Sequence, residues 1–546
     1  MRSSNSDSSR RKFLRTAVTA GATAVVYPAL GAAREITLTP VAPVSEVKPF
    51  GLDEVTIPEL QEGMKSGQYT ARSLVEKYSA RIAEIDKQGP AINAVIELNP
   101  DAAAIAKALD EERKAKGPRG PLHGIPVLIK DNIATADGMM TTAGSLALVG
   151  SKPPKDSMVA LKLRDAGAVI LGKTNLSEWA NMRSSHSTSG WSGRGGLTRN
   201  PYVLDRNPCG SSSGTGAGIS ANLAAVGIGT ETDGSIVCPS SANGLAGIKP
   251  TVGLVSRAGI IPISHSQDGA GPMCRTVRDA AILLGALSAV DPDDAATAAS
   301  AGKSQTDYAQ FCDPNGLKGA RIGVARKYFG FNDAVDALME QSLDGMKKQG
   351  ATLVDPADIE TFGKFDDTEL LVLLYELKAD LNAYLARLSS APIRSLKDLI
   401  DFNERNPQKE MPYFGQDLFM KAEAKGPLTE KAYLEAIQKN HQLAGTEGID
   451  ALMDKHHLDA LVAPTGGPAW LTDLINGDHA AGGSSSAAAV AGYPNINVTA
   501  GFISGLPVGI SFFGRAWSEP ILIKLAYSFE QATKARQTPK FLPTIS

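Results

Sequence analysis

Short apolar segments recur along the whole chain, and helix-like patterns separate many of them. This alternation restricts the fold more strongly than any other feature of the sequence. Apolar runs of this kind, bounded by Gly, Pro or Asp, are typical of buried strands. The runs cover residues 125–129, 168–171, 223–228, 322–325, 458–463 and 506–513. Because helical patterns over residues 157–166 and 368–385 lie between them, we expect an α/β protein with a mainly parallel or mixed sheet.

Some segments have less definite patterns. Residues 223–228 fit a strand, but they fit the end of a helix equally well. Near the beginning, Thr70 is a suitable N-cap for a surface helix that extends through Asp86. The Ala-, Asp- and Ser-rich stretch 291–316 fits either a subdomain junction or a long surface connection. We expect residues 34–546 to form one domain.

Composition and charge narrow the class of protein. The chain has 546 residues, of which 43% are hydrophobic and 21% charged, and its net charge is −3. Such a chain has a large core and no broad positive field, so nucleic acid is not an expected partner. The cysteines, Cys209, Cys238, Cys274 and Cys312, are too few for a disulfide scaffold. The sequence leaves open whether Cys209 and Cys238 pair.

The first 33 residues have the pattern of a twin-arginine export signal. Arg10 and Arg11 precede a weakly apolar stretch, residues 17–30, which small residues follow. A disordered basic tail or a membrane anchor is the alternative, but this stretch is too short to cross a hydrocarbon core of about 30 Å. We therefore expect export by the twin-arginine machinery, a periplasmic or secreted mature protein beginning near Arg34, and no stable membrane association.

Three stretches carry side chains suited to catalysis. In the first, an apolar strand over residues 125–129 ends at Lys130. A lysine held among apolar neighbours loses hydration of its charged form, so its pKa falls and the neutral amine becomes available as a base. The alternative is an ordinary solvated lysine paired with the adjacent Asp131.

The second stretch, residues 207–218, is dense in glycine and hydroxyl side chains and suits close approach to a small polar group. It lacks the lysine of a phosphate-binding loop, and no strand precedes its match to a dinucleotide-binding pattern. It also matches the nucleophile elbow G-x-S-x-G, which would make Ser212 the nucleophile of an α/β-hydrolase with Asp459 and His479. Pro208 opposes that interpretation, because an elbow follows a central strand.

The third stretch, residues 227–239, is a glycine-containing turn that ends at Ser235. The successive N–H groups of Thr232, Asp233, Gly234 and Ser235 are suited to form an oxyanion hole. Considered alone, Ser235 fits a turn or capping serine equally well.

Together and in this order, the three stretches resemble the amidase signature family. The resemblance continues through residues 172–179 and 244–257. It implies a large mixed, mostly parallel β-sheet covered on both faces by α-helices. It also implies that Ser235 is the nucleophile, that Ser211, held by a cis peptide, is the bridging serine, and that Lys130 is the base. Gly210 and Ser212 take supporting roles, and no metal or other cofactor is implied.

Two positions beside Ser235 depart from the commoner family pattern, with Asp233 in place of glycine and Val237 in place of arginine. These residues resemble the bacterial peptide amidases, which implies conversion of C-terminal peptide amides to free acid and ammonia. An amidase acting on aryl or aliphatic amides or carbamates remains an alternative. So do an esterase that uses Ser212 and a non-catalytic exported binding protein on the same scaffold.

Overall fold

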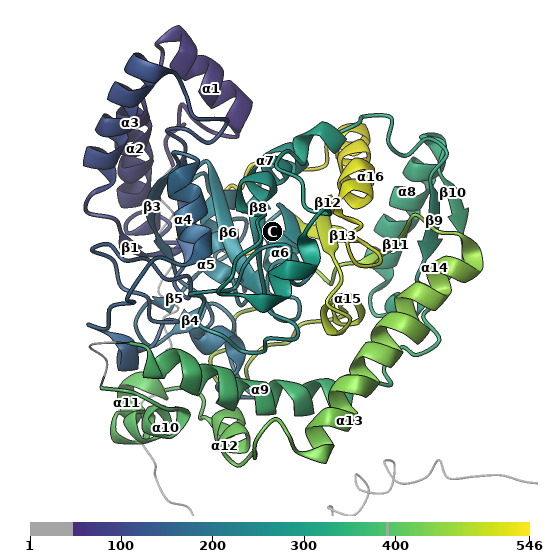
Figure 1. Ribbon diagram of the computed structural model, residues 1–546. Helices are drawn as coiled ribbons and strands as arrows, with labels where there is room; N and C mark the ends of the chain where they lie inside the picture. The colour runs from purple at the N-terminus through teal and green to yellow at the C-terminus, as the bar shows by residue number, and fades with distance from the viewer. Residues whose placement is uncertain (1–46, 389–391, 546) are drawn as a thin grey trace, which may run out of the picture. The chain divides into compact units, whose positions relative to one another are not determined.

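An 11-stranded sheet runs through the computed structural model, which describes residues 47–388 and 392–545 (Figure 1). The strand order is β1-β3-β2-β6-β8-β7-β12-β13-β11-β9-β10. The strands are β1 (Val95–Leu98), β2 (Pro126–Lys130), β3 (Val169–Thr174), β6 (Val226–Glu231), β7 (Ala246–Lys249), β8 (Gly269–Cys274), β9 (Arg321–Val324), β10 (Thr352–Val354), β11 (Ala460–Pro464), β12 (Asn495–Ile503) and β13 (Leu506–Phe513). The short β4 (Trp191–Ser192) and β5 (Gly196–Leu197) form a separate ladder. The predicted signal, residues 1–33, lies outside the described residues.

Parallel and antiparallel ladders both occur in the large sheet. Strand β2 is parallel to β3 and β6, and β9 is parallel to β10 and β11. The ladders of β8 with β6 and with β7, and of β12 with β7 and with β13, are antiparallel. The predicted α/β class with a large mixed sheet is therefore confirmed.

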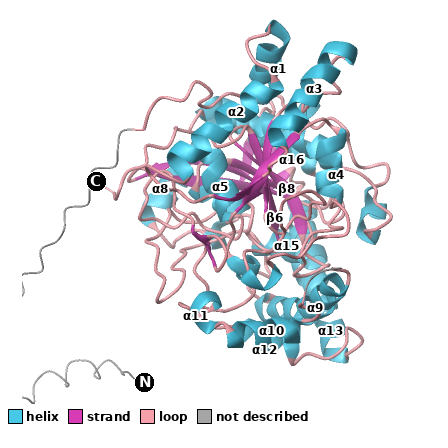
Figure 2. Cartoon of the chain, turned by 90° about the vertical axis from the view of Figure 1, so that its left-hand side faces the viewer, coloured by secondary structure: helices cyan, strands magenta, loops and turns pink. Residues whose placement is uncertain are grey.

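Helices surround the sheet, as the view in Figure 2 shows. They are α1 (Ile57–Ser66), α2 (Ala71–Arg81), α3 (Ala102–Lys116), α4 (Met158–Asp165), α5 (Ser213–Ser220), α6 (Val237–Ala242), α7 (Val277–Leu287), α8 (Asp333–Lys348), α9 (Asp366–Ala386), α10 (Leu396–Arg405), α11 (Pro407–Glu410), α12 (Asp417–Glu423), α13 (Lys431–Asn440), α14 (Ala451–His456), α15 (Ser486–Val490) and α16 (Glu519–Thr533). Among the described residues, no helix combines the length and apolar character needed to cross a bilayer.

Local signals in the sequence explain several of these elements. Thr70 begins α2 with a reciprocal capping interaction, in which its side chain accepts from the N–H of Ser73 and the Ser73 hydroxyl accepts from the N–H of Thr70. The helical turns continue through Asp86 as expected. Residues 223–228 form the turn before β6 and its first half, whereas α5 ends at Ser220. The stretch 291–316 is a connection between α7 and β9.

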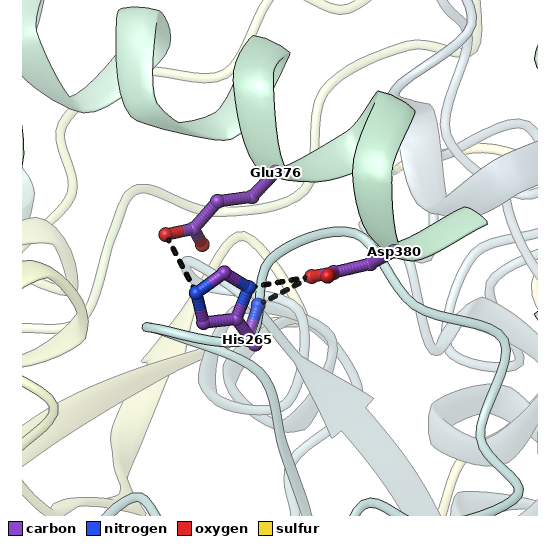
Figure 3. A group of neighbouring side chains, drawn as sticks. All are labelled: His265, Glu376 and Asp380. Atoms are coloured by element: carbon purple, nitrogen blue, oxygen red, sulfur yellow. Dashed lines mark hydrogen bonds and ion pairs between the residues drawn. The ribbon is translucent and has the colours of Figure 1, made fainter. Parts of the chain in front are cut away.

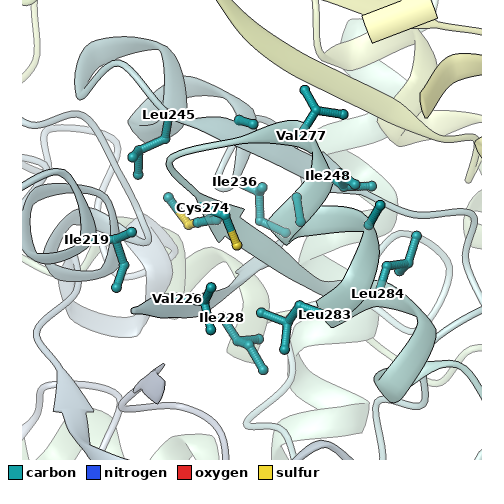
Figure 4. Close-up of a cluster of buried hydrophobic side chains, with 14 of the residues drawn as sticks. Ile219, Val226, Ile228, Ile236, Leu245, Ile248, Cys274, Val277, Leu283 and Leu284 are labelled. Carbon is teal, nitrogen blue, oxygen red and sulfur yellow. The ribbon is translucent and has the colours of Figure 1, made fainter. Parts of the chain in front are cut away.

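The centre of the core lies where α7 packs against β8 and β6. Ile228 from β6, Cys274 from β8 and Leu283 from α7 are all buried there (Figure 4). Burial of each such aliphatic side chain contributes about 1.5–3 kcal/mol relative to an exposed position. This cluster supports the middle of the sheet, directly beside the end of β6.

A second group of helices, α9 to α13, lies below the sheet in Figure 1, and α9, α10 and α12 of this group contribute to a second apolar cluster. Phe419 of α12 packs edge-on against Trp179 at 5.8 Å between ring centroids. Ile261 and Ile263, from the connection between β7 and β8, belong to the same cluster. This connection therefore links the helical group to the sheet.

Gly214 shows why the Gly/Ser-rich stretch is built of small residues. A Cβ atom at this position would lie 2.3 Å from the Ala94 carbonyl oxygen and 2.5 Å from that of Asn175. Both neighbours are backbone atoms, so they cannot move aside as a flexible side chain could. The start of α5 can thus approach β1 and β3 only when this residue is glycine.

We expect Gly214→Ala to lower the free energy of unfolding by about 2 kcal/mol or more, because overpacking against backbone forces the chain to shift. The matched control is Gly345→Ala in α8, where a Cβ would meet nothing within 4 Å. That change should raise stability by up to about 1 kcal/mol through helix propensity. Denaturant unfolding of both variants checks this, and equal stability of the two would contradict it.

Candidate active site

Lys130 is the last residue of β2 and is completely buried. Its Nζ lies 2.7 Å from Ser211 Oγ, 2.9 Å from Thr230 Oγ1 and 3.2 Å from the Thr230 carbonyl oxygen. Strand β6, which pairs with β2, supplies Thr230, and the loop before α5 supplies Ser211. The amine thus contacts one serine and one threonine and is closed off from solvent.

Burial lowers the pKa of the Lys130 amine to about 7, although the charges of Asp268 and Glu231 oppose the change. Near neutral pH, a large fraction of this lysine is therefore uncharged. A neutral amine has two N–H groups and one lone pair. The three contacts of Nζ equal this inventory in number, so donation to the two Thr230 oxygens would leave the lone pair for Ser211 Oγ.

Ser211 follows a cis peptide bond with Gly210, the conformation that the family resemblance implies. The next residue, Ser212, is fully buried and attaches the loop to β6. Its hydroxyl donates to the Thr230 carbonyl at 3.0 Å and accepts from the Thr230 N–H at 3.2 Å. Ser212 therefore both donates a hydrogen bond to β6 and accepts one from it, and the same strand contacts Lys130 through Thr230.

The residues of the alternative α/β-hydrolase set do not meet. The carboxylate of Asp459 accepts from the Arg321 N–H, and His479 lies beside Asp473. In the described part of the chain, neither residue bonds to Ser212. The elbow arrangement that the G-x-S-x-G match suggested is not assembled.

Ser235 lies in the turn between β6 and α6, with 8% of its surface exposed. Its carbonyl accepts from the Ser212 N–H at 3.2 Å. Among the described residues, its hydroxyl makes no hydrogen bond, either to Ser211 or to another group. The backbone therefore brings the two serine-bearing segments together, and the Ser235 hydroxyl is left free.

The turn before Ser235 presents a row of backbone donors. In the described structure, the N–H groups of Thr232, Asp233, Gly234 and Ser235 donate to no acceptor. Gly234 has a φ of +77°, which favours glycine at this turn. The Glu231 carboxylate accepts from the next two N–H groups, those of Ile236 at 2.7 Å and Val237 at 3.0 Å, at the start of α6.

A disulfide joins Cys209 to Cys238, which are 29 residues apart. Cys209 comes just before the Gly210–Ser211 bond, and Cys238 lies three residues after Ser235. The sequence left open whether these two cysteines pair, and the structure shows that they do. The disulfide also links covalently the two segments that the Ser212–Ser235 backbone contact already joins.

A small cavity lies beside Ser211. Its polar lining includes Asn132, Thr230 and Asp268, and its apolar lining includes Ile261 and Ile263. Asn132 Nδ2 donates to Thr230 Oγ1 at 2.9 Å, so this side chain braces the threonine that contacts Lys130. Sequence reasoning did not single out these polar residues, although Thr230 occurs within the third stretch that it selected.

His265, in the connection between β7 and β8, contacts two carboxylate side chains of α9, as Figure 3 shows. Its Nδ1 lies 2.9 Å from Asp380 and its Nε2 3.3 Å from Glu376. The hydrogen bond to Asp380 raises the pKa of His265, and Glu376 adds to the effect. The two carboxylates contact different nitrogens of the ring. The cluster is a bridge of ion pairs between the β7–β8 connection and the helix.

The match to a known family defines the class of protein. The family model described as Amidase matches residues 73–523, and proteins of this class hydrolyse amide bonds. The chain belongs to the amidase signature family.

Individual relatives cover most of the chain. The crystal structure of native peptide amidase from Stenotrophomonas maltophilia has a TM-score of 0.86 and 51% identity, covering 90% of this chain and 100% of that one. A probable amidase of Arabidopsis thaliana is 44% identical over 502 residues, covering 90% of this chain and 93% of the relative. A putative amidase of Arthroderma benhamiae is 40% identical over 522 residues, covering 89% of this chain and 86% of the relative.

Reduction of the Cys209–Cys238 bond should lower the free energy of unfolding by about 3 kcal/mol, because a closed loop of this length restricts the unfolded chain. Denaturant unfolding with and without a thiol reductant measures the change. The double variant Cys209→Ser, Cys238→Ser is the control, and it should unfold at the same denaturant concentration in both conditions. An unchanged midpoint for the reduced wild-type protein would contradict the expectation.

Proposed function

We propose that the protein hydrolyses a carbon–nitrogen amide bond through an acyl-enzyme on Ser235, with Ser211 and Lys130 as a proton relay. The observation that carries the proposal is the 2.7 Å contact between the buried Lys130 amine and Ser211 Oγ. A buried neutral amine can accept a proton from a hydroxyl, and that hydroxyl can in turn accept a proton from a second hydroxyl. No histidine is needed in this scheme.

The reaction begins as neutral Lys130 takes the proton of Ser211 while Ser211 takes that of Ser235. The Ser235 oxygen then attacks the amide carbon, and the N–H groups of residues 232–235 hold the developing oxyanion. The relay returns the proton to the leaving nitrogen, and the C–N bond breaks. Water activated by the same relay then hydrolyses the acyl-enzyme to the free acid, which restores Ser235.

We propose C-terminal peptide amides as the substrate class, with free peptide acid and ammonia as products. Support comes from Asp233 and Val237 beside Ser235 and from the 51% identity to a protein described as peptide amidase. Aryl or aliphatic amides and carbamates are the competing substrates. A panel of a peptide amide, its anilide and the corresponding free peptide tests the choice, and preferential ammonia release from the peptide amide is expected.

We also propose that the protein is exported by the twin-arginine route. Arg10 and Arg11 and the apolar stretch that follows support this, although they lie outside the described residues. The disulfide adds support, because such bonds persist in oxidising compartments. Replacement of both arginines by lysine should retain the precursor in the cytoplasm, which cell fractionation measures. Unchanged export would contradict this route.

Ser235→Ala should reduce ammonia release from a peptide amide at least about 1,000-fold, because removal of a nucleophile leaves only binding and oxyanion stabilisation. The thermal unfolding midpoint should stay within a few degrees of the wild-type value. Ser66→Ala, at the end of α1, is the matched control and should retain full activity. Normal turnover by Ser235→Ala would rule out the proposed nucleophile.

The activity should rise about tenfold per pH unit below pH 7 and level off above it, because only the deprotonated Lys130 accepts a proton. Initial rates of ammonia release between pH 5 and pH 8 measure this acidic limb. Lys130→Met has no base and should be inactive throughout this range. A rate that is already independent of pH at pH 5 would contradict a lysine base.

A further inference from the structure

Asp233 and Glu369 form a pair of carboxyl groups beside the turn that carries Ser235. Asp233 belongs to this turn, whereas Glu369 lies in the first turn of α9. Burial raises the pKa of Glu369, and both the charge of Asp233 and side-chain hydrogen bonding with Asp233 raise it further, so the two carboxyl groups are neighbours. Two carboxyl groups can share a hydrogen bond only if one of them keeps its proton.

The remaining contacts assign that proton. Asp233 Oδ2 accepts from the Ser486 hydroxyl at 2.6 Å. Its Oδ1 is buried and accepts no hydrogen bond from the other described residues. This oxygen is therefore the atom that needs a hydrogen-bond donor. Glu369 Oε1 accepts from Gln267 Nε2 at 3.0 Å, which leaves its second oxygen to carry the proton. In this arrangement each carboxyl oxygen of Asp233 and Glu369 takes part in a hydrogen bond.

The charged surroundings are consistent with one proton on the pair. Burial raises the pKa of Glu369 to about 9, and the charges of Asp233 and of Asp366 on the same helix add to the effect. Glu231 from β6 is a further carboxyl group near Asp233. Lys249 from β7 supplies a positive charge that acts on Asp233. Tyr328, before α8, also faces Asp233 and stays neutral, since its pKa is raised.

We propose that protonated Glu369 is a positioning residue, which holds Asp233 and thereby fixes the oxyanion turn for amide hydrolysis. This inference rests on the proposed function of Ser235. Asp233 is held at one oxygen by Ser486 of α15 and at the other by Glu369 of α9. The turn contains the flexible Gly234, so these two contacts determine the direction of its N–H groups. The helical group α9 to α13 is thereby coupled to catalysis.

Loss of the Glu369 proton reverses the interaction. Two ionised carboxylates repel each other at short range, and the effect is strong in a partly buried site. Asp233 is then pushed away from α9 and the turn loses one of its supports. The second negative charge also opposes the oxyanion that develops on the substrate carbonyl. Both effects act on the transition state, so they lower kcat and leave KM nearly unchanged.

The proposal therefore predicts a bell-shaped pH profile, in which Lys130 produces the acidic limb and Glu369 the alkaline limb. The experiment measures kcat and KM for ammonia release from an N-acylated dipeptide amide between pH 6 and pH 10.5. Wild-type kcat should fall about tenfold per pH unit above pH 9, as for loss of one essential proton.

Three variants distinguish this account from a merely structural role. Glu369→Gln keeps a donor for Asp233 and an acceptor for Gln267 but does not titrate, so its alkaline limb should disappear. Glu369→Leu keeps neither contact, so its kcat should be at least about tenfold below that of Glu369→Gln at pH 8, with KM changed less than about threefold. His265→Gln is the control for the other titrating link to α9 and should keep the alkaline limb.

An unchanged alkaline limb in Glu369→Gln, or wild-type kcat in Glu369→Leu, would overturn the proposal. So would loss of the limb in His265→Gln. Thermal unfolding gives a readout that does not need activity. Unfolded Glu369 ionises near the ordinary glutamate pKa of 4.5, whereas the folded group keeps its proton to about pH 9. Between these values the wild-type protein should lose stability relative to Glu369→Gln as the pH rises.

The two readouts separate failure of this inference from failure of the proposed function. If the wild-type protein releases no ammonia at any pH, the amidase proposal fails, while the unfolding data still report whether the pair holds a proton. If ammonia is released but the difference in unfolding midpoint between wild type and Glu369→Gln stays constant from pH 5 to pH 9, the pair holds no extra proton and the positioning role is wrong.

Discussion

The removal of the Lys130 amine from water is the constraint on which the rest of the site depends. A charged ammonium would be costly to bury without a carboxylate in contact, and the contacts of this amine are instead hydroxyl and carbonyl oxygens of Ser211 and Thr230. The fold resolves this conflict by lowering the pKa to about 7. The same burial that makes the residue unfavourable as a cation makes it useful as a base.

The architecture supplies this environment from segments far apart in the sequence. Adjacent parallel strands β2 and β6 bring Lys130 and Thr230 together at their ends. The loop before α5 then places Ser211 over the amine, and Ser212 fastens that loop to β6. The Cys209–Cys238 disulfide joins this loop to the segment after Ser235. Strands, hydrogen bonds and a covalent link thus hold the same small region.

The sequence was most informative where local chemistry and structure coincide. Apolar runs predicted the strands that end at Lys130 and approach Ser235, because burial on both faces requires continuous apolar residues. The sequence pattern did not predict β8. Its residues Gly269–Cys274 include Gly271 and Pro272 and show no strand-like pattern. That strand exists because β6 and β7 enclose it. The Asp233–Glu369 contact was also invisible, since it joins a turn to a helix more than a hundred residues away and no local pattern encodes it.

A direct titration of the Lys130 amine tests the central claim better than any rate. Lysine labelled with ¹³C at Cε reports the charge of each amine by NMR, and comparison with Lys130→Met assigns the signal. The account predicts a midpoint near pH 7. A midpoint close to the ordinary lysine value of about 10.4 would mean that the amine is charged at neutral pH and would contradict its role as a base.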